Sequence, residues 1–127
     1  MTPARPDPRR ALGAAGELAA ARWYEARGWV VLDRNWRVRD GELDLVLGRD
    51  TTIVFCEVKT RRSDRFGAPV EAVTPRKQQR LRRLAAAWLA QRRDVAPGGR
   101  AELRFDVAAV EPDGAGGFSV DVVEGVG

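Results

Sequence analysis

Two stretches of alternating apolar and polar residues in the first half of the chain predict a β-hairpin. Leucine occupies every second position of residues 42–47, and residues 53–59 alternate in a similar way. Successive side chains of a strand point to opposite faces, so this alternation is typical of strands. A polar turn at Asp50-Thr51 separates the stretches and favours antiparallel pairing. One face of the hairpin should carry Leu43, Leu45, Leu47, Val54, Cys56 and Val58, and the other Glu42, Asp44, Val46, Ile53, Phe55, Glu57 and Lys59.

Three charged side chains gather at the open end of this hairpin. A turn at Asp50-Thr51 brings Asp44 opposite Glu57, and Lys59 shares the face of Glu57. A one-residue change in the loop would separate the two carboxylates, so the register decides whether they meet. Unpaired buried charge is costly, and such groups pair with each other or with a metal. Two interpretations stay open: a salt bridge at a sheet edge, and an oxygen-rich site for a divalent cation with a lysine beside it.

The choice of basic residue favours the cation site. The chain contains 22 lysines and arginines, but only Lys59 and Lys77 are lysines. An ammonium is compact and rotatable, whereas a guanidinium is a rigid planar fork. A chain that uses arginine almost everywhere else therefore indicates a specific need for an ammonium at Lys59.

Composition excludes several classes of chemistry. The chain has no histidine and one cysteine, which removes histidine-based triads and the usual zinc sites. Carboxylates, lysine or arginine, hydroxyls and a hard metal remain. With 127 residues, 44% of them hydrophobic, we expect one globular domain over residues 9–127, preceded by a disordered proline-rich arm over residues 1–8.

The cellular location follows from cysteine use and hydropathy. Cys56 lies in the most apolar strand, which favours a reduced core residue in a cytoplasmic protein. No apolar stretch approaches the roughly 20 residues that span a bilayer, and the N-terminus lacks the apolar core of a signal peptide. We therefore expect a cytoplasmic protein without a membrane partner.

Charge is distributed unevenly along the chain. The net charge is +4, but residues 61–93 hold ten basic and two acidic residues, whereas residues 94–127 hold two basic and seven acidic ones. A basic segment directly after a carboxylate cluster indicates a polyanion steered over a cation site. The loop over residues 61–69 is either a solvated connection or a phosphate-contacting loop.

The first helix should begin at Asp7-Pro8, an N-cap followed by proline, and end at Gly28. Glu17 has only small apolar neighbours one turn away, which would let its face pack close to a sheet; an exposed glutamate on an alanine-rich helix is the alternative. The predicted inward stripe is Leu12, Ala15, Ala19, Trp23 and Ala26.

The rest of the chain predicts a strand over residues 29–38, a second helix opening at Thr74-Pro75, and strands over residues 103–110 and 118–123. Asp106 and Asp121 are interpreted as edge-strand or pairing carboxylates. In the second helix, Lys77 and Gln78 fall on the inner face with Leu81, Leu84, Ala85, Trp88 and Leu89, and Arg76, Arg80 and Arg83 lie outside.

An ordered series of motifs resembles a known family. The segments are Gly16-Glu17, Asn35-Trp36-Arg37, Gly41-Glu42-x-Asp44-Leu45-Val46, Val54-Phe55-x-Glu57-Val58-Lys59-Thr60-Arg61, Phe66-Gly67-x-Pro69-Val70-Glu71-Ala72-Val73, Lys77-Gln78-x-Arg80-Leu81 and Arg104-Phe105-Asp106-Val107. They resemble the bacterial YraN family, within the restriction-endonuclease-like PD-(D/E)xK nuclease superfamily and near its Holliday-junction-resolvase-like branch. The proline-aspartate motif of the superfamily is Leu43-Asp44 here. The resemblance implies a restriction-endonuclease-like α/β core, with a mixed sheet of four or five strands flanked by helices in the order α-β-β-β-α-β-β.

The resemblance also implies hydrolysis of DNA phosphodiesters, including branched or repair intermediates, with Mg²⁺ or Mn²⁺ as cofactor. Asp44 and Glu57 would ligate the metal together with the Val58 backbone carbonyl, and Glu17 would act through a bound water. A non-catalytic nucleic-acid-binding or interaction module that retains the fold is the alternative.

The same resemblance assigns the remaining roles. Lys59 would orient the attacking water or stabilise charge on the phosphate. Gln78, or Lys77 beside it, would contact the phosphate or water. A homodimer would suit a four-way junction, although no residue argues for one. The expected nucleic-acid contacts are Arg61, Arg62, Arg76, Lys77 and Arg80.

Overall fold

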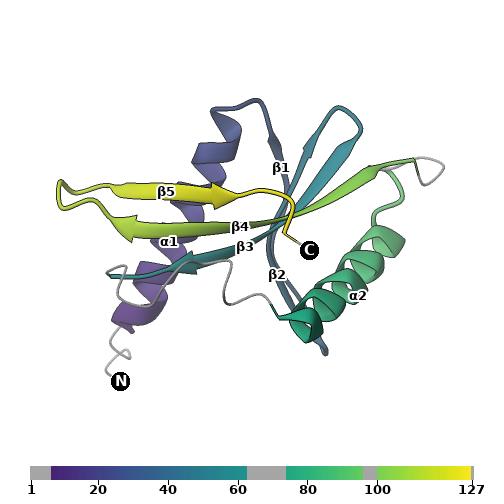
Figure 1. Ribbon diagram of the computed structural model, residues 1–127, viewed down its shortest axis with the longest axis horizontal. Helices are drawn as coiled ribbons and strands as arrows, with labels where there is room; N and C mark the ends of the chain where they lie inside the picture. Colours follow the sequence, from purple (N-terminus) through teal and green to yellow (C-terminus); the bar gives the residue numbers. More distant parts are fainter. Residues whose placement is uncertain (1–6, 63–73, 96–99, 127) are drawn as a thin grey trace, which may run out of the picture.

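The computed structural model describes residues 7–62, 74–95 and 100–126. Within them the chain forms a mixed five-stranded sheet in the order β1-β2-β3-β4-β5, with only β3 and β4 parallel (Figure 1). A parallel pair needs a crossover connection, and α2 lies on it. The predicted order of helices and strands is confirmed. The elements are α1 (Pro8–Glu25), β1 (Val30–Val38), β2 (Gly41–Arg49), β3 (Thr52–Thr60), α2 (Pro75–Gln91), β4 (Glu102–Pro112) and β5 (Phe118–Val123).

Both helices begin at the predicted caps. The Asp7 side chain accepts a hydrogen bond from the backbone N–H of Arg9, and the Thr74 hydroxyl accepts one from Lys77. Each cap satisfies a donor that has no partner inside the helix. Pro8 already belongs to α1, so the predicted arm is shorter at its C-terminal end, and residues 1–6 and 63–69 of the predicted arm and loop lie outside the described residues.

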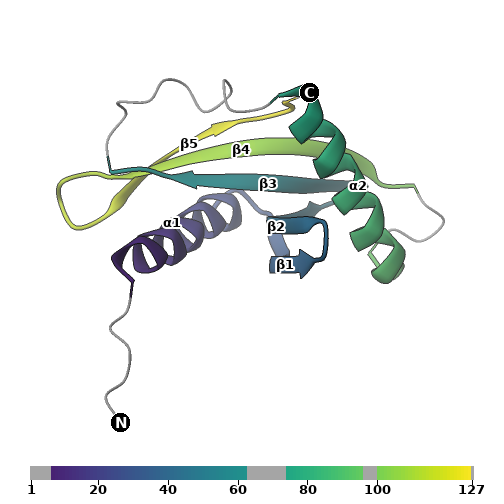
Figure 2. The ribbon, with the colours of Figure 1, turned by 90° about the horizontal axis from the view of Figure 1, so that it is seen from below.

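The helices pack against opposite faces of the sheet (Figure 2). Alternate residues of β3 contact each helix layer: Val54 and Cys56 lie in the α1 layer, and Ile53 and Phe55 in the α2 layer. The predicted apolar face of α2 is confirmed, since Trp88 and its neighbours Leu84 and Ala85 are buried. In the described parts of the chain, no helix has the length and hydrophobicity needed to cross a membrane.

The predicted inward stripe of α1 is correct only in part, because Ala19 and Trp23 pack against the core but the fully buried face is the neighbouring one. The buried residues of the helix are Gly16, Ala20, Ala21 and Tyr24, whereas Leu12, Ala15, Ala19 and Trp23 are half-buried and Ala26 is exposed. The face that contacts the sheet is the one formed by the small residues around Glu17. Small side chains let the helix backbone come close to β3, and this close approach outweighs the larger apolar side chains on the neighbouring face.

The predicted hairpin register is confirmed. Arg49 pairs with Thr52 across a two-residue turn, and the ladder continues to Leu45 and Cys56. One predicted facing is wrong, because Leu43 packs in the α2 layer instead of with Leu45 in the α1 layer. The β2–β3 ladder ends at Leu45, and the start of β2 turns toward α2, where a Cβ added to Gly41 would lie 3.3 Å from Leu84.

Asp106 is a pairing carboxylate, as predicted, but it does not lie on an edge strand. It is 1% exposed on β4, inside the sheet, where it accepts hydrogen bonds from Tyr24 Oη at 2.6 Å and from the Arg104 guanidinium at 2.9 and 3.0 Å. The backbone N–H of Gly125 also donates to it. This network connects α1, β4 and the end of the chain. Asp121 is exposed on the edge strand β5.

Candidate functional site

The predicted charged residues converge on one hollow of about 430 Å³ at the end of β3 that lies away from the β2–β3 turn. Asp44, Glu57 and Lys59 all line it, so the two strands do bring these side chains to a common space. Glu17 and Val58, also predicted from the sequence, line the same hollow. The complete lining is Glu17, Gly41, Glu42, Leu43, Asp44, Cys56, Glu57, Val58, Lys59, Lys77, Arg80, Leu81 and Leu84.

Glu57 lies at the centre of the ionic contacts in this hollow. Its side chain is 13% exposed, and its Oε1 atom is 2.7 Å from Lys77 Nζ and 3.2 Å from Lys59 Nζ. Its second oxygen, Oε2, is buried and has no hydrogen-bond partner in residues 7–62, 74–95 and 100–126. A buried carboxylate oxygen without a partner is costly in a folded protein. The Oε2 atom of Glu57 is therefore available as a ligand, because no donor among the described residues satisfies it.

Asp44 is held by the backbone of the neighbouring strand. Its Oδ2 atom accepts a hydrogen bond of 2.8 Å from the Val58 N–H, which connects β2 to β3 beyond the end of their ladder. Burial raises the pKa of Asp44 to about 6; the Val58 hydrogen bond opposes this, and the carboxylates of Glu17, Glu42 and Glu57 add to the increase. At pH 7 Asp44 is therefore mainly ionised, but its charged form is less stable than that of an exposed aspartate, and a bound cation would stabilise it.

Lys59 remains positively charged beside these carboxylates. Burial lowers its pKa, but the charge of Glu57 and its hydrogen bond outweigh this effect, and the net result is a raised pKa. The side chain is 35% exposed, so the ammonium contacts both Glu57 and solvent. It can donate hydrogen bonds to a phosphate oxygen or to a water molecule that enters the hollow.

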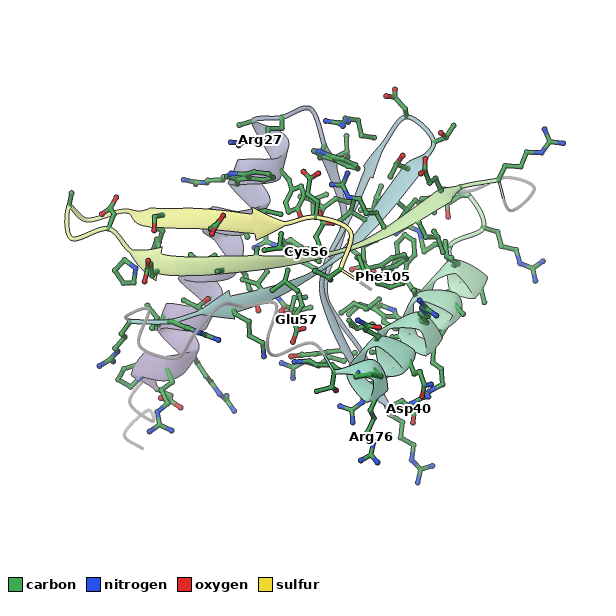
Figure 3. The ribbon with its side chains drawn as sticks, viewed as in Figure 1. Arg27, Asp40, Cys56, Glu57, Arg76 and Phe105 are labelled. Atoms are coloured by element: carbon green, nitrogen blue, oxygen red, sulfur yellow. The ribbon has the colours of Figure 1, made fainter. Side chains whose placement is uncertain are left out.

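The first turn of α2 supplies the second ammonium. The Thr74 cap fixes the backbone of Lys77, whose side chain reaches Glu57 from α2, on the face of the sheet that Glu57 shares with Ile53 and Phe55. Figure 3 shows Glu57 beside this turn and Arg76 pointing outward from it. Gln78 is half-buried and does not line the hollow, so of the two residues proposed for this position the structure brings in Lys77.

Glu17 reaches the hollow because the preceding residue is glycine. A Cβ added to Gly16 would lie closer than 3.0 Å to side-chain atoms of Thr60, so only glycine lets α1 pass over β3 at this point. Glu17 is half-buried at this crossing. Of the two interpretations of Glu17, the close approach to the sheet is the correct one.

The donor set fits a hard divalent cation only if other ligands complete it. No three acidic side chains in the described parts of the chain come together closely enough to hold a metal ion on their own. Asp44 and Glu57 offer carboxylate oxygens, and Val58 offers a backbone carbonyl. Mg²⁺ is commonly bound through one or two carboxylates, with waters and substrate phosphates as the remaining ligands. The Oε2 atom of Glu57, which has no partner among the residues that the structure describes, is the observation that favours such a cation.

Six of the described residues that line the hollow were not identified as site residues from the sequence: Gly41, Glu42, Leu43, Cys56, Leu81 and Leu84. Glu42 lines the hollow and pairs with Arg37 at 2.9 Å. Leu84 lines it from α2, where it was predicted only as a core residue. Glu42 could have been identified from the sequence, because it lies in the same motif as Asp44. Leu84 could not, because nothing in the local sequence distinguishes it from the other apolar residues of α2.

The basic residues expected to contact nucleic acid surround the hollow unevenly. Arg76 and Arg80 are exposed on α2, and Arg80 also lines the hollow. Arg62 is exposed just after β3, and Arg61 is half-buried, with its N–H donating to the Val110 carbonyl. These positions allow contacts with a polyanion on the α2 side of the hollow.

A larger hollow of about 550 Å³ lies near the β2–β3 turn, at the other end of β3. Its lining is mainly apolar and backbone, with Arg49, Asp50 and Arg100 as its charged members, and none of the predicted site residues lines it. Size therefore does not identify the chemical site in this protein. The smaller hollow, which holds the carboxylates and both lysines, is the candidate.

Comparison with known proteins gives a consistent family assignment. The model of a family described as "Uncharacterised protein family UPF0102" matches residues 16–110. A UPF0102 protein of Beutenbergia cavernae is 54% identical over 92% of this chain and 96% of its own length. A UPF0102 protein of Frankia alni is 50% identical over 91% of this chain and 92% of its own length. The matched residues contain every residue that lines the hollow.

Proposed function

The chain belongs to the family UPF0102, the family that the YraN motifs indicated, and we propose that it is a divalent-metal-dependent nuclease that hydrolyses DNA phosphodiesters. The proposal places the chain in the restriction-endonuclease-like PD-(D/E)xK superfamily. One observation carries it: Glu57, whose buried Oε2 atom has no partner among the described residues, lines a hollow that is also lined by Asp44, Lys59 and Lys77.

The charge pattern of the hollow matches the demands of phosphodiester hydrolysis. A phosphodiester is an anion that repels a nucleophile, so positive charge must surround the phosphorus centre before water can attack. A bound Mg²⁺ would supply Lewis acidity and favour a hydroxide-like water. Asp44, Glu57 and the Val58 carbonyl are the atoms that would hold it.

The lysines and Glu17 have roles that depend on their positions. Lys59 donates hydrogen bonds into the hollow, where it orients the attacking water or binds a phosphate oxygen as negative charge develops. Glu17 adds a carboxylate from α1 and is positioned to hold a water next to the cation. The attacking water would lose a proton to solvent as its oxygen bonds to phosphorus, and the departing oxygen of the sugar would take a proton from solvent as the P–O bond breaks.

The substrate proposed is a nucleic acid, because the exposed arginines of α2 lie beside the hollow, and DNA is proposed because the family resemblance implies it. Arg76 and Arg80, with Arg62 after β3, would contact phosphates along a strand whose scissile phosphate enters the hollow. Contacts of this kind are independent of base sequence and weaken steeply with salt. Branched substrates are the first to test, because the resemblance includes the resolvase-like branch.

The test is cleavage of labelled four-way junctions, flaps and single strands in Mg²⁺, Mn²⁺ or EDTA. Cleavage should require the cation and should be lost in both Asp44→Ala and Lys59→Ala. Asp121→Ala removes an exposed carboxylate on β5 and should leave cleavage unchanged. Circular dichroism and DNA binding are measured on each variant, so that a lost fold is not mistaken for lost catalysis.

Two outcomes would contradict the proposal. Equal cleavage by wild type and both variants would identify a contaminating nuclease. Salt-sensitive DNA binding without cleavage under any cation, and without dependence on Asp44, would favour the non-catalytic binding module instead.

A further inference from the structure

Lys59 and Lys77 share one acceptor atom. Both ammonium groups contact Oε1 of Glu57, at 3.2 and 2.7 Å, while Oε2 of the same carboxylate is buried without a partner in the described residues. Lys59 is two residues from Glu57 on β3, whereas Lys77 reaches it from α2. The shorter contact is therefore the one made by Lys77, which is distant from Glu57 in the sequence. This contact connects α2 to β3 across the hollow.

We propose that Lys77 is an exchangeable counter-ion, which neutralises Glu57 in the metal-free protein and transfers to a DNA phosphate when a divalent cation takes its place. This inference rests on the proposed function and concerns how the same site couples its two ligands. Lys77 is then a positioning residue whose partner changes from Glu57 to substrate.

Electrostatics give the direction of the exchange. A buried carboxylate needs a compensating charge, and in the metal-free protein Lys77 provides it. When Glu57 binds a divalent cation, the neighbouring ammoniums are repelled, and Lys77 gains less from its contact with Oε1. Both side chains are flexible. The backbone of Lys59 lies two residues from Glu57 on the same strand, whereas Lys77 approaches Glu57 from the first turn of α2, beside the exposed arginines that would contact DNA, so Lys77 is the ammonium placed to turn toward a phosphate.

The freed ammonium has a suitable second partner. Lys77 lies on the first turn of α2, and its side chain is 29% exposed, so it faces both the hollow and solvent. The first turn of a helix favours anions through its unpaired N–H groups and its dipole. Lys77 can therefore bind a phosphate next to the scissile one without a movement of α2.

Such an exchange makes cation and DNA binding cooperative. By linkage, the cation must tighten DNA binding by the same factor by which DNA tightens cation binding. Loss of Lys77 should therefore raise the cation affinity of the DNA-free protein and lower the cooperativity between cation and DNA binding. The affinity rises because the cation no longer displaces an ion pair.

The experiment compares Lys77→Met with the matched control Arg76→Met. Arg76 is the neighbouring residue on the same turn; it is exposed and points away from the hollow, so its removal changes net charge equally without removing the contact with Glu57. Calorimetry measures Mn²⁺ binding to the metal-free proteins, and fluorescence anisotropy measures binding of a labelled four-way junction in EDTA and in Ca²⁺.

The expected results differ between the two variants. Lys77→Met should bind Mn²⁺ about tenfold more tightly than wild type, and the factor by which Ca²⁺ tightens junction binding should fall several-fold. Arg76→Met should weaken junction binding similarly in EDTA and Ca²⁺, with little change in Mn²⁺ affinity.

The failures can be told apart. If Lys77→Met binds Mn²⁺ no more tightly than Arg76→Met, or retains the full Ca²⁺ effect on DNA, the counter-ion exchange is wrong while the metal site stands. If wild type shows no Mn²⁺ binding that Asp44→Ala abolishes, the proposed function itself fails.

Discussion

Replacing Asp44 by asparagine should stabilise the metal-free protein. The carboxylate has a pKa of about 6 in the folded chain against an ordinary value of 3.8, mainly because it is buried. Folding therefore costs free energy whenever Asp44 is ionised. A difference of this size corresponds to about 3 kcal/mol at high pH, at 1.36 kcal/mol per pH unit. Asparagine keeps the acceptor for the Val58 N–H and removes the charge.

The sign of the pH dependence follows from proton linkage. Between about pH 4 and 6 the folded protein binds more protons at Asp44 than the unfolded chain does, so stability is lost as the pH rises through this range. The gain from Asp44→Asn should thus be absent below pH 4 and reach about 2–3 kcal/mol, or roughly 10 °C in melting temperature, at pH 8.

Thermal denaturation in EDTA, followed by circular dichroism at pH 4 and pH 8, tests this expectation. Asp121→Asn, which removes an exposed carboxylate on β5, is the control and should change the melting temperature little at either pH. The reasoning is refuted if Asp44→Asn melts at or below the wild-type temperature at pH 8, or if its gain is equal at both pH values.

The remaining predictions concern packing and buried groups. Gly16→Ala should destabilise the fold by about 1–3 kcal/mol in urea denaturation, because its Cβ would collide with β3, whereas Gly13→Ala, with open space around it, should not; equal effects would contradict the close crossing. Burial raises the pKa of the Cys56 thiol to about 12, so a thiol reagent at pH 8 should modify the native protein only as it unfolds, and rapid labelling would refute this burial. Tyr24→Phe should cost about 1–3 kcal/mol in the same urea assay, because it removes the 2.6 Å hydrogen bond to buried Asp106, and a neutral effect would show that the bond contributes little.

The hairpin and the helix caps could be predicted because their signals are local. The alternation of β3 and the short turn fix which side chains share a face, and this placed Glu57 and Lys59 together correctly. The face of α1 could not be predicted in the same way. In a helix composed largely of alanine, hydrophobicity differs little around the axis, and the buried side is decided by how closely Gly16 lets the helix approach β3.

The candidate site likewise contains one part that local sequence patterns predict and one part that depends on how the helices dock. Asp44 and Glu57 lie directly beyond the last pair of the hairpin ladder, Leu45 and Cys56, so the register brings them close together, and the hydrogen bond from the Val58 N–H then holds Asp44 there. The Lys77 contact with Glu57 depends on where α2 docks after a crossover, which no local pattern determines. The prediction that Leu43 shares a face with Leu45 was wrong for a related reason. The ladder with β3 ends at Leu45, and β2 then turns toward α2.

Anomalous scattering from crystals soaked in Mn²⁺ decides whether Asp44 and Glu57 form a cation site with Lys59 beside it. We expect a peak within ligand distance of the Asp44 and Glu57 carboxylates and the Val58 carbonyl, with Oε2 of Glu57 as a ligand. A fully occupied peak elsewhere, or none in the hollow at saturating Mn²⁺, would contradict this expectation.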